Sequence, residues 1–394
     1  MQSPIRSDKL LILTVFVVAI ACLAAYQLFG NNTDHKPPTR PPSERSPLVP
    51  SAAREFLGVA LQLQSGWEDN PYEKYIDEIA ATGADTVCLV VSGHQESGSS
   101  TSIFVDLRKN PSDKRLKELL AYCRKGDSKA ERPAMKVVLM PIVLLDHPKG
   151  EEWRGSIEPS DWDRWWANYT GFVLHYAKVA QAAGVEVFMI GSELVSTETQ
   201  AERWRELIDK VRAEYKGRLA YSANWDHYRP ITFWAQLDMI GMTTYYDLTG
   251  GKEPTVERLK ESWRPLKNKI LEWRNANYPK HPIIFTEVGW PNQTTCAQYP
   301  WDYYRAKDKP DPEAQANCFE AFFETWMDEP AVAGYLVWEW RNHPGQATGP
   351  EDTSYVPCGK PAEKVIGKHY RAARSARATT APAEQQAQKD VTGR

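Results

Sequence analysis

Between residues 56 and 373 the sequence alternates between short apolar segments and amphipathic segments, and this alternation most constrains the fold. The apolar segments have the length and composition of strands that are buried on both faces. We predict strands over 56–63, 85–91, 135–145, 185–191, 218–225, 239–246, 282–287 and 332–338. Amphipathic helices are predicted over 72–82, 114–124, 159–183, 199–215, 256–274, 312–327 and 361–373, with a short helical linker at 233–234. Eight strands that alternate with about eight helices predict a (β/α)8 TIM barrel, an α/β fold, as a single catalytic domain over residues 54–373.

A doubly wound open sheet is the alternative for this order of elements. That fold carries a glycine-rich phosphate-binding turn after its first strand. The segment Leu61–Gln64 does not supply such a turn, so we favour the barrel.

Two of the predicted strands deliver a glutamate at their carboxyl ends. Glu193 follows the fourth strand and Glu287 ends the seventh. A TIM barrel builds its active site at these strand ends, so we expect the two side chains to face each other across the mouth. Glycosidic bond cleavage needs such a pair, one carboxyl protonated and one ionised, and a separation of about 5 to 5.5 Å gives a retaining reaction. The sequence does not fix that separation.

Several motifs around these glutamates resemble glycoside hydrolase family 113 in their order along the chain. They are Gly191–Leu194, Trp204–Ile208, Ala223–Asp226, Leu237–Gly241 with Tyr245 and Tyr246, and Phe285–Gly289. The resemblance runs from about Phe56 to Tyr370 and implies a retaining barrel hydrolase similar to β-mannanases. It implies that Glu193 is the general acid/base and Glu287 the nucleophile. Relatives in the wider clan often place Asn before the acid to bind the sugar 2-hydroxyl, where this chain has Ser192.

The chain is rich in aromatic residues, with 15 Trp and 18 Tyr, and flat rings with a polar edge suit the apolar faces of sugars. For many of these rings, packing in the core is the alternative interpretation. The candidate substrate-binding residues are Trp338, Tyr245, Tyr246, Asn224, Trp225, Trp290, His94 and Trp67. Glu339 is either a further site residue or, as we favour, the partner of Arg341 or of a loop in a salt bridge.

Charge and cysteine content exclude some classes of partner. Lys and Arg number 48 against 51 Asp and Glu, which gives no sign of a nucleic-acid partner. No cluster or spacing of acidic, Cys or His residues indicates a metal site, so we expect no cofactor. If the domain lies outside the cytoplasm, two of Cys296, Cys318 and Cys358 could form a disulfide, and the sequence leaves the pair open.

The two ends of the chain have compositions that differ from the central domain. Residues 1–30 contain an uncharged apolar run of about bilayer length, which predicts a transmembrane signal-anchor, with a cleaved or lipidated signal segment as the alternative. Residues 31–53 form a Pro-rich tether, and residues 374–394 a disordered tail. We expect a membrane-anchored protein whose catalytic domain is extracytoplasmic, periplasmic or at the cell surface, or else a secreted one.

These observations predict a retaining hydrolase of a β-linked polysaccharide or oligosaccharide, with β-1,4-mannan as the first candidate. One alternative is a barrel at the cell envelope that binds glycans without cleaving them. A second is a hydrolase of another β-linked hexose polymer. The sequence leaves open the glycan, endo or exo action, and the oligomeric state.

Overall fold

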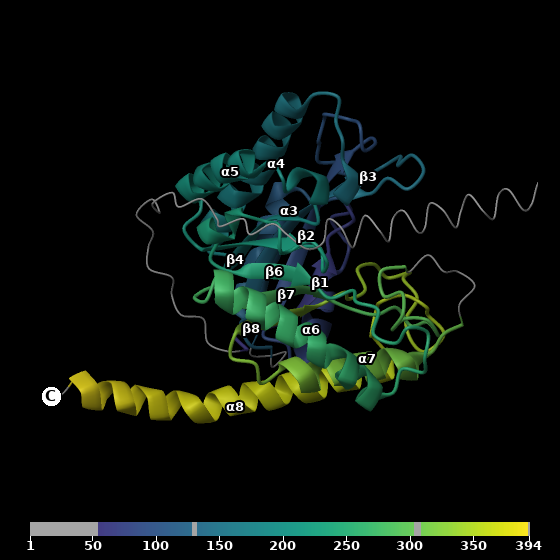
Figure 1. Cartoon of the computed structure of the whole chain (residues 1–394). Helices are drawn as coiled ribbons and strands as arrows, with labels where there is room; N and C mark the ends of the chain where they lie inside the picture. The colour runs from purple at the N-terminus through teal and green to yellow at the C-terminus, as the bar shows by residue number, and fades with distance from the viewer. Residues whose placement is uncertain (1–53, 128–131, 303–308, 393–394) are drawn as a thin grey trace, which may run out of the picture. The chain divides into compact units, whose positions relative to one another are not determined.

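The strands form a closed barrel, as the alternating sequence pattern predicts. A computed structural model of the chain describes residues 54–127, 132–302 and 309–392. Within these residues eight parallel strands pair in sequence order, and β8 closes the barrel by pairing with β1 (Figure 1). The strands are β1 Phe56–Gln62, β2 Thr86–Gln95, β3 Lys136–Leu145, β4 Val187–Ser192, β5 Arg218–Ala223, β6 Ile240–Thr243, β7 Ile283–Val288 and β8 Val332–Val337. The prediction of a (β/α)8 TIM barrel is confirmed.

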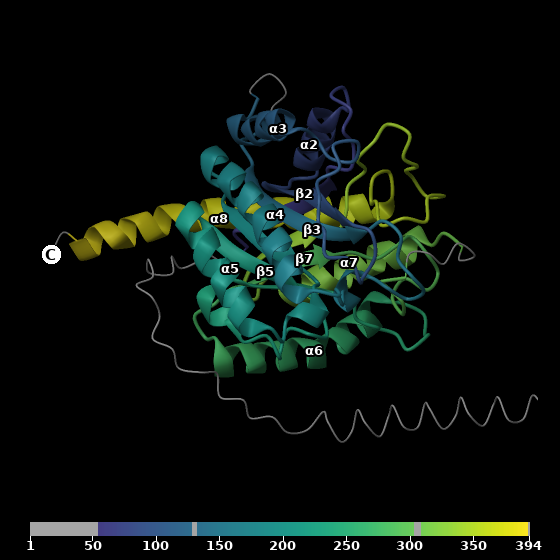
Figure 2. The same ribbon diagram turned by 90° about the horizontal axis from the view of Figure 1, so that it is seen from above.

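Helices surround the strands (Figure 2). They are α2 Tyr72–Ala81, α3 Asp113–Lys125, α4 Trp162–Ala183, α5 Ala201–Glu214, α6 Val256–Asn277, α7 Pro312–Trp326 and α8 Pro361–Thr392. Between β5 and β6 the connection holds the short 3₁₀ helix η3 Phe233–Gln236, in agreement with the predicted linker. Helix α4 begins three residues later than the predicted start at 159, because Asp161 rather than Ser160 accepts the hydrogen bond from the N–H of Arg164.

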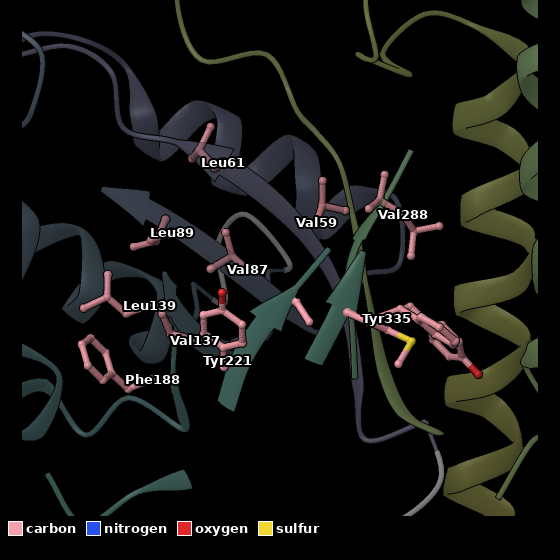
Figure 3. Close-up of a cluster of buried hydrophobic side chains, with 14 of the residues drawn as sticks. Val59, Leu61, Val87, Leu89, Val137, Leu139, Phe188, Tyr221, Val288 and Tyr335 are labelled. Carbon is pink, nitrogen blue, oxygen red and sulfur yellow. The ribbon is translucent and has the colours of Figure 1, made fainter. Parts of the chain in front are cut away.

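Each strand is apolar throughout because both of its faces are buried. In β2, Cys88 and Val90 lie in the cluster inside the barrel, whereas Val87 and Leu89 belong to the cluster between the strands and the helices. Figure 3 shows Val87 and Leu89 with outward-facing residues of the other strands. Alternate side chains of a strand point to opposite faces. The strands therefore carry two apolar layers, and the polar side chains of the site lie near their carboxyl ends.

Helix α8 continues through residues 374–392, for which we predicted a disordered tail. The segment is rich in Ala and also contains Gln and Arg, which are all strong helix formers. The first turns beyond residue 373 are also held by the barrel's amino-terminal end. There, Arg374 donates to the carbonyl of Gly83 (3.4 Å), and Arg377 donates to the carbonyl of Glu55 (3.1 Å).

The predicted membrane segment and tether, residues 1–53, lie outside the described residues. In the part of the chain that the structure describes, no helix combines the length and apolarity that a membrane span requires. The described cysteines are free thiols, so the disulfide considered for Cys296, Cys318 and Cys358 is not formed in this structure. The buried thiols of Cys296 and Cys318 instead contact each other.

Candidate active site

Glu193 follows β4 on a turn with an uncommon backbone conformation. Its φ angle is 52°, in the left-handed region that residues with a Cβ rarely adopt. The N–H of Glu193 donates to the carbonyl of Ser222 (2.8 Å), and the N–H of Leu194 donates to the hydroxyl of Tyr221 (2.9 Å). Such a conformation costs of the order of 1 to 3 kcal/mol, and the surrounding bonds must hold it. The turn carries the Glu193 carboxylate to the carboxyl end of the barrel.

The buried carboxyl group of Glu198 stabilises this turn through Tyr221. The hydroxyl of Tyr221, which accepts from Leu194, donates in turn to Glu198 (2.7 Å). Burial raises the pKa of Glu198 to about 8. Sequence reasoning missed Glu198 because it lies in the segment between β4 and α5, where no strand end marks it.

Glu287 lies in β7 and is almost completely buried, with 2% of its surface exposed. Its Oε2 accepts a hydrogen bond from the hydroxyl of Tyr245 (2.8 Å), and its Oε1 accepts one from Ser192 (3.4 Å). The hydroxyl of Thr244 donates to the backbone carbonyl of Glu287 (2.9 Å). After the strand, Gly289 passes so close to β8 that a Cβ there would meet the carbonyl of Trp338 at 2.3 Å. These contacts fix the carboxylate in one position.

Arg154 joins the two glutamates, and sequence reasoning did not assign it to the site. It begins the 3₁₀ helix η1, Arg154–Ser156, in the long loop between β3 and α4. Its Nη2 lies 2.6 Å from Oε2 of Glu193 and 3.8 Å from Oε1 of Glu287. Both distances are measured from one nitrogen, so the two oxygens lie no farther apart than the two distances combined, about 6.4 Å. One sequence signal could have found Arg154. A site with two carboxylates is expected to hold a cation nearby, and Arg154 lies in the loop that follows β3.

The electrostatics of the pair favour one proton shared between two carboxyl groups. Burial raises the pKa of Glu287 to about 8, and the negative charge of Glu193 acts in the same direction. The guanidinium of Arg154 and the hydroxyl of Tyr245 lower the pKa of Glu287 but do not cancel the rise. Two carboxyl groups that hold one proton can supply an acid and an anionic nucleophile together.

Of the predicted substrate-binding residues, Tyr245 lies against Glu287 and Trp338 directly follows β8. Tyr245 contacts the Glu287 carboxylate. Trp338 follows β8, is 9% exposed, and lies with Tyr245 in the cluster inside the barrel. Trp225, half-buried after β5, packs its ring nearly parallel to that of Trp301 at 6.1 Å between centroids. Trp301 is 45% exposed and was missed from the sequence, where it falls in the long segment between β7 and α7.

Three of the predicted substrate-binding residues have structural positions, which corrects their assignment. Trp290 is fully buried, and its ring packs on Phe319 of α7 rather than lying open to a substrate. Tyr246 is buried in the outer layer, and its hydroxyl donates to the carbonyl of Trp225 (2.7 Å).

His94 is 2% exposed, and both ring nitrogens are bound within the protein. Its Nδ1 pairs with Asp146 (2.8 Å) and its Nε2 with Ser92 (3.1 Å), so neither is left for a substrate. The histidine instead connects the ends of β2 and β3.

The remaining two candidates lie on loops. Asn224 donates to Asp226 (2.8 Å) directly after β5, and Trp67 is 75% exposed between β1 and α2. Neither contacts the two glutamates through a described interaction. Among the described residues no group of three or more His, Cys, Asp or Glu side chains has an arrangement that could hold a metal ion.

Residues 60–360 match the model of Glycoside Hydrolase Family 113. The solved structure of the GH113 β-mannanase AaManA from Alicyclobacillus acidocaldarius, in complex with ManMIm, is 27% identical in sequence with a TM-score of 0.70. That comparison covers 81% of this chain and 98% of that one. The complex of a GH113 β-1,4-mannanase has 24% identity, a TM-score of 0.68 and coverage of 81% and 99%.

A more distant likeness extends only to the fold. A β-glucuronidase from Ruminococcus gnavus shares 12% identity with a TM-score of 0.53, over 80% of this chain and 50% of that one. Comparison with curated protein sequences found no match.

Proposed function

The chain belongs to glycoside hydrolase family 113, and on that premise we propose that it cleaves β-1,4-linked mannan with retention of the anomeric configuration. Membership makes it a glycoside hydrolase. The choice of mannan is supported by the similarity to two solved β-mannanases, which extends over nearly their whole length. The proposal assigns Glu287 as the nucleophile and Glu193 as the acid/base.

The observation that carries the retaining mechanism is the single Arg154 nitrogen that contacts both carboxylates. It limits the separation of the nearer oxygens to about 6.4 Å. Inverting enzymes need about 6.5 to 9.5 Å, to leave room for a water molecule, whereas retaining enzymes use about 5 to 5.5 Å. The spacing therefore supports direct attack by one carboxylate on the sugar.

The hydrogen bonds to Glu287 support its assignment as the nucleophile. Tyr245 and Ser192 both donate hydrogen bonds to Glu287. These bonds stabilise the negative charge of its carboxylate and fix the orientation of that group. In the first step Glu287 attacks the anomeric carbon while Glu193 gives its proton to the departing oxygen, and the glycosidic bond breaks. In the second step Glu193 takes a proton from water, whose oxygen replaces Glu287 at the same carbon. The two steps together return the pair to its starting protonation.

The position of Arg154 can decide which of Glu193 and Glu287 is ionised. In the free site Arg154 lies closer to Glu193 than to Glu287, and burial, which raises the pKa of Glu287 to about 8, keeps a proton on Glu287 near neutral pH. Catalysis needs the opposite distribution. A sugar that binds between the carboxylates and moves the guanidinium toward Glu287 would ionise the nucleophile and leave the acid protonated.

Replacement of Arg154 by methionine is expected to lower kcat/KM about 100-fold, because a positive charge next to the reacting carboxylates is lost. Without that charge the pKa of Glu287 rises further, so the acidic limb of the pH profile of kcat/KM moves to higher pH. Kinetics on a manno-oligosaccharide between pH 4 and 9 measure both effects. The matched control is Arg164→Met, which removes an exposed arginine of α4. An unchanged acidic limb in Arg154→Met would exclude this electrostatic role.

The proposed function is tested by incubating the purified protein with oligosaccharides of β-1,4-mannan, glucomannan, cellulose and xylan. We expect release of reducing ends from mannan and glucomannan, with the β-anomer as the first product in ¹H NMR spectra. An α-anomer as the first product would contradict retention. Cleavage of cellulose or xylan alone would identify another β-linked polymer as the substrate. Binding without cleavage of any of the four would favour a glycan-binding barrel.

A further inference from the structure

A third carboxyl group lies at the mouth of the barrel, next to the two glutamates. Glu339 follows Trp338 at the end of β8, and Gln62 ends the adjacent strand β1. The side-chain amide of Gln62 donates to Oε2 of Glu339. Gln64 donates to the amide oxygen of Gln62 (2.5 Å), so three polar side chains form a chain that runs from the site to the surface.

Glu339 has no cation to balance its charge among the described residues. Arg341, the partner that we favoured from the sequence, instead forms an ion pair with Glu78 of α2. Burial raises the pKa of Glu339 to about 7, and its hydrogen bond with Gln62 only partly opposes the rise. Glu339 is half-buried, and a carboxyl group that is withdrawn from water without a cation costs stability. Such groups occur most often where function requires them.

Glu339 follows the strand that lies between β7 and β1 in the closed barrel. In the closed barrel, β8 and β1 follow β7 on the side away from β4. On the proposed mechanism the departing group lies on the side of Glu193, at the end of β4, which leaves the side of β8 and β1 for the retained sugar. Strand β8 pairs directly with β7, with Val337 beside Val288, so Glu339 follows the strand end next to the one that carries Glu287.

We propose that Glu339 and Gln62 together bind adjacent hydroxyl groups of the retained sugar, an inference that rests on the proposed function. The second oxygen of Glu339 accepts from one hydroxyl, and the second N–H of Gln62 donates to the neighbouring hydroxyl oxygen. An acceptor and a donor held side by side match the alternating donor and acceptor groups of a vicinal diol. The ring of Trp338, the residue before Glu339, is placed to lie against the apolar face of the same sugar.

The test combines variants of the protein with substrates that lack single hydroxyl groups. The probes are aryl β-mannosides that carry 2-, 3-, 4- or 6-deoxy substitutions, compared with the parent glycoside. The variants are Glu339→Gln and Gln62→Leu, with Glu351→Gln in the following loop as the exposed control. For the wild-type protein we expect two adjacent deoxy positions to lower kcat/KM about 10- to 150-fold each, the range for hydrogen bonds to charged groups.

A direct contact makes the substrate change and the protein change non-additive. In Glu339→Gln the parent glycoside should lose activity by a similar factor, and removal of the hydroxyl that Glu339 binds should then cause little further loss. The same holds for Gln62→Leu and the neighbouring hydroxyl. A merely structural role would lower activity on all five glycosides by the same factor, and that result would overturn the proposal.

The outcome also separates this proposal from the proposed function. If the wild-type protein cleaves the parent glycoside and the losses are additive at every position, the hydrolase stands and the hydroxyl-binding pair is wrong. If the parent is bound but not cleaved, the mechanism fails. The same comparison of dissociation constants by calorimetry then supports or overturns the pair. Absence of both cleavage and binding would overturn both.

Discussion

Glu287→Ala should lose at least about 10⁴-fold in kcat on every substrate that the wild-type protein cleaves, because no covalent intermediate can form without the carboxylate. Tyr245 and Ser192 both direct hydrogen bonds at this group, so the remaining site cannot replace it. Initial rates on manno-oligosaccharides and on an activated aryl β-mannoside measure the loss. The control is Glu261→Ala, which removes an exposed carboxylate of α6.

A small external anion gives a further test of this assignment. Azide fits the space that the Glu287 side chain leaves and attacks the same face of the sugar. The product is therefore an α-glycosyl azide, with the configuration inverted. Activity of Glu287→Ala within tenfold of the wild-type value, or rescue that gives the β-azide, would assign the nucleophile to another residue.

Glu193→Ala is expected to have an effect that depends on the leaving group. With an oligosaccharide, whose departing oxygen needs a proton, we expect kcat/KM to fall about 10²- to 10⁴-fold. With a 2,4-dinitrophenyl glycoside the departing oxygen needs no proton, so the first step stays fast and the glycosyl-enzyme accumulates. Stopped-flow measurements should then show a burst of dinitrophenolate equal to the enzyme concentration.

Azide also tests the assignment of Glu193, and here the expected product has the opposite anomeric configuration. In Glu193→Ala it attacks the glycosyl-enzyme in place of water and gives a β-glycosyl azide, with the configuration retained. Equal losses with both leaving groups would show that Glu193 does not act as the acid. Together the two variants distinguish the two carboxylates by the configuration of one product.

The order of elements along the sequence predicts some of the site residues but not others. Glu287 and Tyr245 both stand near strand ends, and strand ends in a TIM barrel meet at one rim, so their proximity follows from the order of the elements. Trp290 stands only three residues after Glu287, yet it is fully buried under α7. Its ring packs against Phe319 of α7, a contact that the spacing from Glu287 does not predict. His94 likewise ends a strand but is bound on both nitrogens.

The sequence by itself determined the barrel and the two glutamates at its rim, because periodic burial and strand order are properties of the chain in linear order. Only the tertiary structure revealed the contacts that make these glutamates a pair. Arg154 lies 39 residues before Glu193, in an irregular loop without a periodic pattern, and it reaches both carboxylates through space. Gln62 and Glu339 meet because the barrel closes, which brings β1 next to β8 although 277 residues separate these two side chains in the chain. Contacts of this kind depend on closure and loop conformation, which the local sequence does not encode.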